Sequence, residues 1–433
     1  MVGRRRPLGA AAAAASIAFV LVVTAVPTAA FATNPPSVPT PQDIAAAKQN
    51  ETAKQAEITK ISGLLAQYQQ LSDDAQRDAQ QKSEDVTVAQ QKLDAATQTA
   101  NQLTAQQKAA QKKAAASQRQ AGAIIAQLAR TGGGDVTLGL ISGSGAQTDQ
   151  LLQRLGAMNR LSATSQAILQ NAEYDRNAAS SLAKQAAVAK AKRASLASEA
   201  QDAADASQKA ADAANAKVAS VESTQSTLYA QLADLKGTTA ALEQQAAAAA
   251  ALAAAQQISQ PSSSGSSGSG GPTGSSGSSG STGSSGSTTP PKGVDPTPPA
   301  PSASAVAKVV AYAEAQLGKP YVDGGAGPDV WDCSGLTMRA YQAVGIPIGG
   351  HGTNLQYNYL RNAGRLVDRR TAGIAAGDLL FYADGGDPNI LNYHVTMAIG
   401  GGQMIEAPYP GLGVRIVAIR TTDLVPYVGR PTG

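Results

Sequence analysis

A long stretch without proline or large aromatic residues constrains the fold of this chain more than any other feature. Residues 42–260 contain no proline, tryptophan or phenylalanine, and alanine, glutamine, lysine, aspartate and serine dominate. Strong helix formers without breakers favour long helices over a globular core. Apolar residues recur at three- and four-residue steps, as in Ile58, Ile61 and Leu65, which is coiled-coil spacing. We therefore expect an all-α coiled coil, and its alanine-rich seam leaves the oligomeric state open.

A glycine-rich segment at residues 131–145 interrupts this helical stretch. It separates a helix of about 90 residues from one of about 110, each longer than about 100 Å at about 1.5 Å per residue. An antiparallel hairpin is the most economical arrangement of two such helices. The sequence therefore predicts a helical coiled-coil region over residues 33–260, folded as an antiparallel hairpin.

The tip of the expected hairpin, near residues 131–155, is more apolar than either arm. An exposed apolar tip on a polar rod is a candidate docking surface. The alternative is a small cap whose side chains pack on each other, and the sequence does not decide between the two. The apolar residues concerned are Val136, Leu138, Leu140, Ile141, Leu151, Leu152 and Leu155.

Residues 1–32 have the three parts of a signal peptide. Three arginines at 4–6 precede an apolar run at 8–26, and small residues follow up to Ala32. We expect cleavage after Ala32 and a secreted or cell-wall protein. The alternative is an uncleaved membrane anchor, because the apolar run is close to spanning length. The arginines leave Sec and Tat export both open.

The composition changes twice more along the chain. Residues 261–302 are serine, glycine, threonine and proline, which cannot bury enough apolar surface to order themselves and predict a disordered linker. Residues 303–433 hold the only cysteine, both histidines and the only tryptophan, and their number suits one hydrophobic core. Basic and acidic residues balance in this last segment. No basic surface for DNA or RNA is expected, so nucleic acid is excluded as a partner.

Cys333 is the only cysteine, and His351 and His394 are the only histidines. Asp332 precedes the thiol and an amphipathic run follows it, which predicts a helix that begins at the cysteine. A helix N-terminus favours thiolate over thiol and lowers the pKa of the cysteine. The alternative is a buried structural cysteine, since free cysteine is among the most buried residue types. Its position at the expected helix start, and the absence of a second cysteine to pair with it, favour a reactive nucleophile.

The second half of this segment has the pattern of β-strands. His394 opens one of them, and Glu406 lies on its expected partner across a glycine turn at 400–402. An antiparallel pair would bring both side chains to one face of the sheet. The expected strands cover 378–382, 394–400, 403–408 and 414–419, and a helix is expected over 303–317.

Cysteine, histidine and a carboxylate together suit nucleophilic acyl transfer. Cys333 would attack a carbonyl, His394 would move the proton, and Glu406 would orient the imidazole and stabilise its cation. A thiolate–imidazolium pair is then the expected resting state. Taken singly, His394 reads as a core histidine and Glu406 as a solvated strand residue. The spacing matches no zinc motif, so no metal or other cofactor is expected.

Five short motifs in this order resemble those of NlpC-type peptidoglycan endopeptidases. The resemblance covers about the last 130 residues and implies a papain-like α+β fold with Cys333, His394 and Glu406 as the catalytic residues. A glutamate in the third position is similar to the Rip subgroup of secreted endopeptidases. The motifs are LGKPY at 317–321, DCSGL at 332–336, GDLLF at 377–381, HV at 394–395 and MIEAP at 404–408.

The resemblance also implies the substrate and the residues around the nucleophile. It implies cleavage in peptidoglycan stem peptides, commonly between D-Glu and the following diamino acid. Tyr321 would lie near the oxyanion, and His351 would contact substrate or form the cleft wall. Asp323 stands where an aromatic residue is common in the family. The expected substrate-binding or oxyanion residues are Tyr321, Asp332, Ser334 and His351.

The helical region resembles the coiled coils of cell-division hydrolases that dock on an FtsEX-type membrane complex. The resemblance implies that such a complex engages the tip near residues 131–155. A lytic domain on a long tether also has a high local concentration for contact with its own chain. We therefore expect the long helices to restrain the enzyme until a partner engages the tip.

The sequence thus predicts a secreted peptidoglycan endopeptidase for wall remodelling or cell separation. Two alternatives remain. One is a non-catalytic coiled-coil adaptor that binds the cell wall and a division complex. The other is an amidase or acyltransferase on the same fold.

Overall fold

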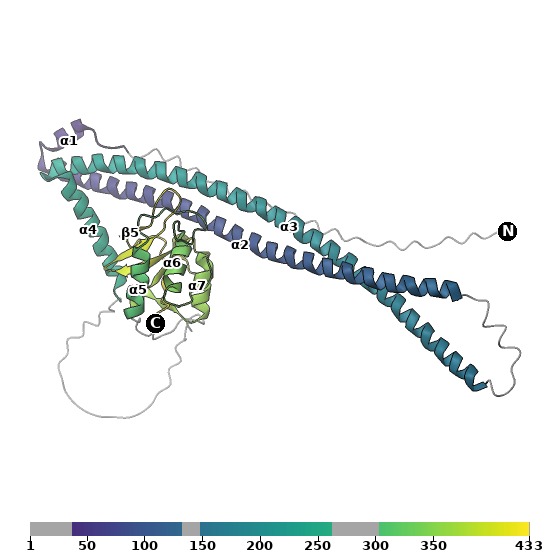
Figure 1. Ribbon diagram of the computed structural model, residues 1–433. Coiled ribbons are helices and arrows are strands. Elements are labelled where there is room, and N and C mark those ends of the chain that lie inside the picture. The colour runs from purple at the N-terminus through teal and green to yellow at the C-terminus, as the bar shows by residue number, and fades with distance from the viewer. Residues whose placement is uncertain (1–36, 132–147, 262–302, 433) are drawn as a thin grey trace, which may run out of the picture.

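The computed structural model describes residues 37–131, 148–261 and 303–432 (Figure 1). The expected signal peptide, most of the hairpin tip and the expected linker lie outside the described residues. So do Val136, Leu138, Leu140 and Ile141. Leu151, Leu152 and Leu155 lie in a helix whose side chains are not described there. Within the described ranges, no helix has both the length and the apolar character needed to cross a bilayer.

Two long helices dominate the N-terminal region and confirm its all-α character. α2 spans Glu51–Thr131 and α3 spans Thr148–Lys236, and they lie side by side over most of their length (Figure 1). They are antiparallel, because the residue numbers of the α3 partners fall as the residue numbers along α2 rise. The hydrogen-bonded pairs are Gln69 with Gln225, Ser83 with Ser207, and Ser117 with Asp175. We call α2 and α3 the helical hairpin.

The seam of the helical hairpin changes character along its length. At its base, large side chains from both arms form a cluster with α1 (Pro41–Ala47), including Ile61, Tyr68 and Leu228. Further out, the buried apolar residues are almost all alanine. A seam of small side chains removes less apolar area from water per residue, so the base carries most of the hydrophobic stabilisation. The alanines are Ala100, Ala114, Ala121, Ala172, Ala179 and Ala186.

The second expected helix is not continuous, so the prediction of about 110 residues in one helix is wrong. α3 ends at Lys236, Gly237 takes a positive φ of 74°, and α4 covers Ala240–Ser259. The Thr239 hydroxyl caps α4 by accepting from the Leu242 N–H at 3.3 Å. A left-handed glycine followed by a threonine N-cap is a common way to end one helix and begin another.

The C-terminal domain, residues 303–432, is an α+β unit with one antiparallel sheet, as expected. The sheet order is β1-β6-β2-β3-β4-β5. The sequence predicted β2 to β5 but not the short strands β1, at one edge of the sheet, and β6, which lies between β1 and β2. The strands are β1 (Leu366–Asp368), β2 (Leu379–Tyr382), β3 (His394–Gly400), β4 (Gln403–Glu406), β5 (Arg415–Ala418) and β6 (Tyr427–Gly429).

The helices of this domain cover one face of the sheet. They are α5 (Ala303–Glu314), α6 (Cys333–Gln342) and α7 (Thr353–Asn362), with short α8 (Arg369–Ala372) and a 3-10 turn, η2 (Asp384–Gly386), at the edges. Their buried side chains share one core with the inward residues of the sheet. That core includes Val309, Leu336, Tyr341, Leu360, Leu379, Phe381, Val395 and Met397.

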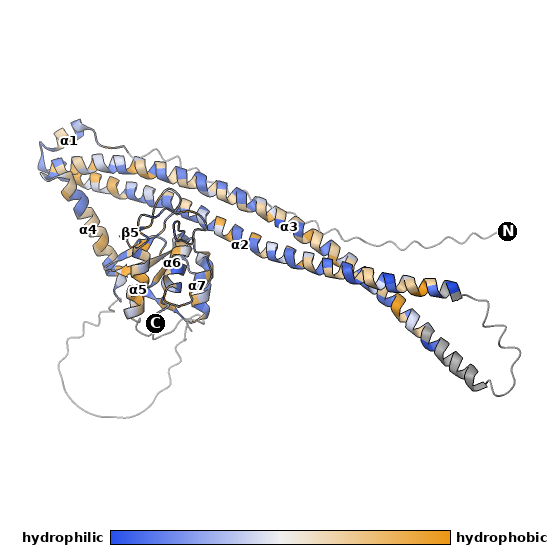
Figure 2. Cartoon of the chain, in the orientation of Figure 1, coloured by the Kyte–Doolittle hydropathy of each residue, from blue (hydrophilic) through white to orange (hydrophobic). Residues whose placement is uncertain are grey.

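The other face of the sheet is covered by α4, which belongs to the N-terminal region. Ala255 and Ile258 of α4 pack against a cluster that contains Leu380 and Met404 of the sheet. α4 is largely apolar where it meets the sheet (Figure 2). The C-terminal domain therefore completes its second core layer with a helix that precedes it in the sequence, from residues 240–259.

The domain also docks against the base half of the helical hairpin. It lies between α4 and α2 (Figure 1). Polar contacts hold it there: Arg77 with Asp423 at 3.1 Å, Gln81 with Asp384 at 2.6 Å, Ser207 with Asp323 at 2.8 Å and Asn215 with the Pro410 carbonyl at 3.1 Å.

Candidate active site

The β3–β4 hairpin brings His394 and Glu406 together. β3 and β4 pair antiparallel, with Met397 opposite Ile405, and His394 and Glu406 lie further out on the same two strands. The His394 Nε2 lies 2.9 Å from Glu406 Oε2, and both side chains are almost fully buried. Since an ionised carboxylate only accepts hydrogen bonds, Nε2 carries the proton and Nδ1 remains free as a base.

Two arginines complete the surroundings of Glu406. Arg415 Nε donates to Oε1 at 2.9 Å, and Arg420 donates to both carboxylate oxygens at 3.0 and 2.9 Å. Burial by itself raises the pKa of Glu406, but the arginines and the imidazole hold it well below its usual value. Glu406 is therefore ionised and fixed in orientation.

His394 is neutral in this arrangement. Burial lowers the pKa of His394, Glu406 opposes that effect, and the two arginines add to the lowering. α6 packs on β3, the strand that begins at His394. A neutral imidazole whose Nε2 donates to Glu406 keeps Nδ1 as a proton acceptor.

Cys333 begins α6, as the sequence predicts. Asp332 is the N-cap: its Oδ1 accepts from the Gly335 N–H at 2.6 Å and from the Ser334 hydroxyl at 3.1 Å. A Cβ added to Gly335 would lie 2.1 Å from the Gly325 carbonyl oxygen. The motif therefore needs Asp for the cap and Gly for the close approach of the backbone, and together they fix the thiol at the first helical position.

The thiol does not have the lowered pKa that its helix position predicts. Burial raises the pKa of Cys333 well above its usual value, and the carboxylates of Asp332 and Glu84 raise it further. The Thr353 hydroxyl, 3.6 Å from Sγ, and the Val395 N–H oppose this more weakly. Desolvation exceeds the helix dipole here. The raised pKa of Cys333 and the lowered pKa of His394 favour a neutral thiol and a neutral imidazole, so the expected thiolate–imidazolium resting state does not fit this arrangement.

The other expected site residues lie close to Cys333, in different settings. Tyr321 is buried, and burial followed by the charges of Cys333 and Asp332 raises the pKa of its hydroxyl well above the usual value. The His351 Nε2 lies 2.6 Å from Asp332 Oδ2. The side chains of Asp332 and Ser334 bond to each other within the cap. Their roles toward substrate stay predictions.

Helix α2 covers this site. Glu84 and Thr87 of α2 are buried, Gln91 Nε2 donates to the His351 carbonyl at 2.9 Å, and Asn354 Nδ2 donates to Glu84 Oε1 at 3.3 Å. A Cβ on Gly352 would meet Gln91 Nε2 at 2.3 Å, so the fit is close. Cys333 is only 6% exposed as a result of this packing and its own domain.

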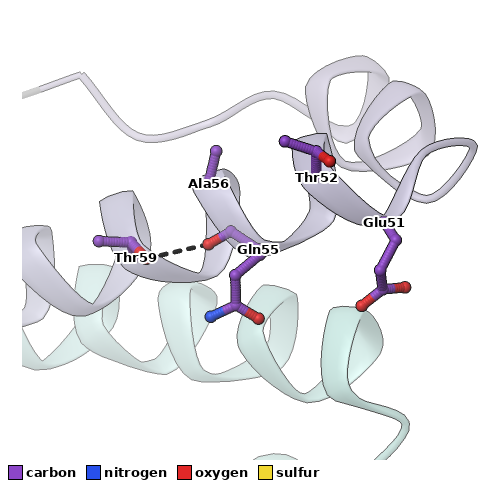
Figure 3. A pocket seen from close by; sticks show the side chains of 5 residues that line it. All are labelled: Glu51, Thr52, Gln55, Ala56 and Thr59. Carbon is purple, nitrogen blue, oxygen red and sulfur yellow. Dashed lines mark hydrogen bonds between the residues drawn. The ribbon is translucent and has the colours of Figure 1, made fainter.

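A hollow elsewhere on the surface lacks comparable chemistry. Figure 3 shows that it lies along α2 near its start, where the Thr59 hydroxyl donates to the Gln55 carbonyl at 2.9 Å. Its lining has one carboxylate and no thiol or imidazole. It is therefore no rival to the site at Cys333. The lining residues are Glu51, Thr52, Gln55, Ala56 and Thr59.

Residues 318–426 match the model of the NlpC/P60 family. The C-terminal region of this chain is an NlpC/P60 domain. Peptidoglycan endopeptidase RipA of Mycolicibacterium smegmatis is 37% identical over 139 residues, which cover 29% of this chain and 26% of that protein. Peptidoglycan endopeptidase RipB of Mycobacterium tuberculosis is 35% identical over 151 residues, covering 32% of this chain and 58% of RipB.

The solved structure of the peptidoglycan hydrolase RipB from M. tuberculosis is 35% identical, with a TM-score of 0.25, and the match covers 30% of this chain and 66% of that one. The chain matches less than two thirds of the length of each of these relatives. The similarity lies in the NlpC/P60 domain and leaves the helical region to be interpreted from its own residues.

Two groups of residues around this NlpC/P60 domain escape sequence reasoning. Arg415 was hidden because it pairs with Glu406 only through the β4–β5 register. Arg420 follows β5 and reaches back to the same carboxylate. The α2 residues that cover the site belong to no motif, since a glutamate or glutamine on a long polar helix looks like any solvated residue.

Proposed function

We propose that this protein is a secreted peptidoglycan endopeptidase with Cys333 as nucleophile, His394 as base and Glu406 as the orienting carboxylate. The observation that carries the proposal is the buried His394–Glu406 pair, at 2.9 Å, on the strand against which the helix of Cys333 packs. The names of the relatives, peptidoglycan endopeptidases RipA and RipB, support the substrate class.

The proposed reaction begins when a stem peptide replaces α2 in the cleft. His394 Nδ1 takes the thiol proton and Sγ attacks the scissile carbonyl. Glu406 stabilises the imidazolium, and in this proposal N–H groups at the start of α6 and the Tyr321 hydroxyl stabilise the oxyanion. The imidazolium then protonates the leaving amine and a thioester remains. Water, deprotonated by the same imidazole, releases the acid and restores the thiol.

We propose that the bond cleaved is the one between D-Glu and the diamino acid, in line with the family resemblance. The purpose would be wall remodelling or cell separation. We keep the division of the chain as a proposal: signal peptide 1–32, helical region 33–260, linker 261–302 and enzyme domain 303–433. Docking of an FtsEX-type membrane complex at the tip near 131–155 also stays a proposal.

We further propose that the docked arrangement is latent. α2 holds Glu84 and Gln91 against the loop and helix that follow His351, where substrate must enter to reach Cys333. A thiol with a raised pKa beside a neutral histidine is also a weak nucleophile. Release of α2 exposes the cleft and removes one of the carboxylates that disfavour thiolate.

Digestion of purified muropeptides tests both proposals. The full chain is compared with its Cys333→Ala variant and with a chain that begins at Thr239. The shortened chain keeps α4 on the sheet and removes α2 and α3. Paired fragments from a D-Glu-linked species, absent with Cys333→Ala, are expected, with faster release by the shortened chain. Equal rates from full and shortened chains would contradict latency.

Other products would favour the alternatives. If every chain binds muropeptides but leaves them uncut, the non-catalytic adaptor is the remaining hypothesis. Release of the whole stem peptide from the sugar would instead indicate an amidase, and transfer to an added amine would indicate an acyltransferase.

A further inference from the structure

Arg415 joins the candidate active site to the helix that covers it. Its Nε donates to Glu406 Oε1 at 2.9 Å, while its Nη2 donates to Oε1 of Gln76 on α2 at 2.8 Å. The side chain is 32% exposed. One guanidinium therefore bonds at the same time to the carboxylate that orients His394 and to the cover.

Arg420 makes a useful contrast because its side-chain hydrogen bonds stay within the domain, although its charge also acts on Asp73 of α2. It donates to both oxygens of Glu406, and its guanidinium carbon lies 5.0 Å from the centre of the Tyr382 ring. Within the described part of the chain, Arg415 is the member of this arginine pair that hydrogen-bonds to α2. Undocking of α2 thus removes a hydrogen-bond acceptor from Arg415 and leaves the hydrogen bonds between Arg420 and Glu406, which lie within the domain.

We propose that Arg415 is a positioning residue that links docking of α2 to the charge balance at Glu406 and, through Glu406, to His394. In the docked state Gln76 holds Arg415 against Glu406. After release, Arg415 loses that acceptor, gains solvent and interacts less strongly with the carboxylate. The inference rests on the proposed function and adds an electrostatic component to latency, beside steric cover.

The direction follows from the charges around His394. Arg415 and Arg420 both oppose a positive charge on the imidazole, and Glu406 favours it. Loosening Arg415 leaves Glu406 freer to stabilise the imidazolium, so proton transfer from Cys333 becomes easier. Other titratable groups that bear on this cluster are Tyr382 of β2, Tyr393 before β3, Tyr409 after β4 and Asp73 of α2.

Histidine NMR of the full chain tests the inference without any need for turnover. The chain has two histidines, so the imidazole signals of His351 and His394 can be assigned with one His351→Gln variant. We expect Arg415→Gln to move the His394 titration midpoint to higher pH. Gln76→Ala should move it in the same direction, and Arg415→Lys, which keeps a charge, should move it less than Arg415→Gln.

Gln81→Ala is the matched control. Gln81 is also on α2 and also bonds to the C-terminal domain, through Asp384 at 2.6 Å, but does not reach Arg415. We expect it to leave the His394 midpoint unchanged. Equal shifts for Gln76→Ala and Gln81→Ala would overturn the inference in favour of general undocking. An unchanged His394 titration midpoint in Arg415→Gln would also overturn it. So would a His394 signal that, in both wild type and variant, shows no protonation before acid unfolds the protein.

The two proposals fail separately in these experiments. If muropeptides are not cleaved but the His394 midpoint responds to Arg415 and Gln76, the linkage stands and the proposed reaction is wrong. If muropeptides are cleaved and the acid limb of the kcat/KM profile is the same in wild type and Arg415→Gln, the reaction stands and the linkage is wrong.

Discussion

Asn354 donates its side-chain N–H to Oε1 of Glu84 at 3.3 Å, which joins a carboxylate of the long helix α2 to α7 of the NlpC/P60 domain. The other oxygen of that carboxylate, Oε2, is buried without a hydrogen-bond partner. A buried, half-satisfied carboxylate is a costly way to hold two parts of a chain together. Docking therefore depends on whether Glu84 carries a charge.

This dependence gives a pH prediction for docking. Burial raises the pKa of Glu84 from 4.5 to about 7, and Asp332 adds to the rise. Because the docked form binds the proton more tightly, docking is strongest below the undocked pKa. It weakens as pH rises toward about 7 and levels off above that. The full effect is on the order of 3 kcal/mol. Amide hydrogen-exchange protection of residues 83–91 and 351–357, corrected for intrinsic rates, measures it.

Glu84→Gln is expected to remove this pH dependence, since an amide fills the same space without charge. The control is Asp85→Asn, because Asp85 lies next to Glu84 but is exposed and pairs with Lys82. If hydrogen-exchange protection falls with rising pH equally steeply in wild type and in Glu84→Gln, another group is responsible for the pH dependence. His351 and Asp323, whose pKa values are also raised, are the first to examine.

A charge reversal on α2 should release this helix from the C-terminal domain and so activate the enzyme. Arg77 of α2 lies 3.1 Å from Asp423 of the domain, whose side chain is only 7% exposed. Arg77→Glu sets two carboxylates against each other, so we expect faster muropeptide digestion than wild type. Lys82→Glu, on the same helix but paired within it, should digest at the wild-type rate. If Arg77→Glu is no faster, this contact does not contribute to latency.

The backbone at Cys333 predicts a contrast between two glycines. A Cβ at Gly335 would lie 2.1 Å from the Gly325 carbonyl oxygen, whereas nothing lies within 4 Å of one at Gly63. Gly335→Ala is expected to destabilise the C-terminal domain by about 2 kcal/mol or more through overpacking. Gly63→Ala in α2 should stabilise by about 0.5–1 kcal/mol through helix propensity. Thermal unfolding of both variants gives the comparison, and a tolerated Gly335→Ala would mean that the turn at Gly325 can move.

The sequence predicted those parts of the molecule that depend on local pattern. The His394–Glu406 pair followed from two strands joined by glycines, and the start of α6 followed from Asp332 before Cys333. The break between α3 and α4 was also present locally, as Gly237 before Thr239, but a long alanine-rich helix on either side concealed it.

What could not be predicted depends on contacts between distant segments. Gln91 and His351 lie 260 residues apart in the sequence, and neither belongs to a pattern that indicates the other. The same is true of Gln76 and Arg415. Their meeting depends on how α4 packs on the sheet and on how α2 and α3 contact the C-terminal domain.

Glu406 should matter as much for folding as for the proposed chemistry. It is fully buried between Arg415, Arg420 and His394, so Glu406→Gln leaves two arginines without their counter-charge. Breaking such a network by removing one charge costs about 3–5 kcal/mol. Urea unfolding followed by the fluorescence of Trp331, the only tryptophan, measures that loss. The exposed Glu314→Gln should change stability by less than about 0.5 kcal/mol. If Glu406→Gln unfolds at the wild-type urea concentration, the arginines are solvated in solution and the carboxylate is not the centre of this cluster.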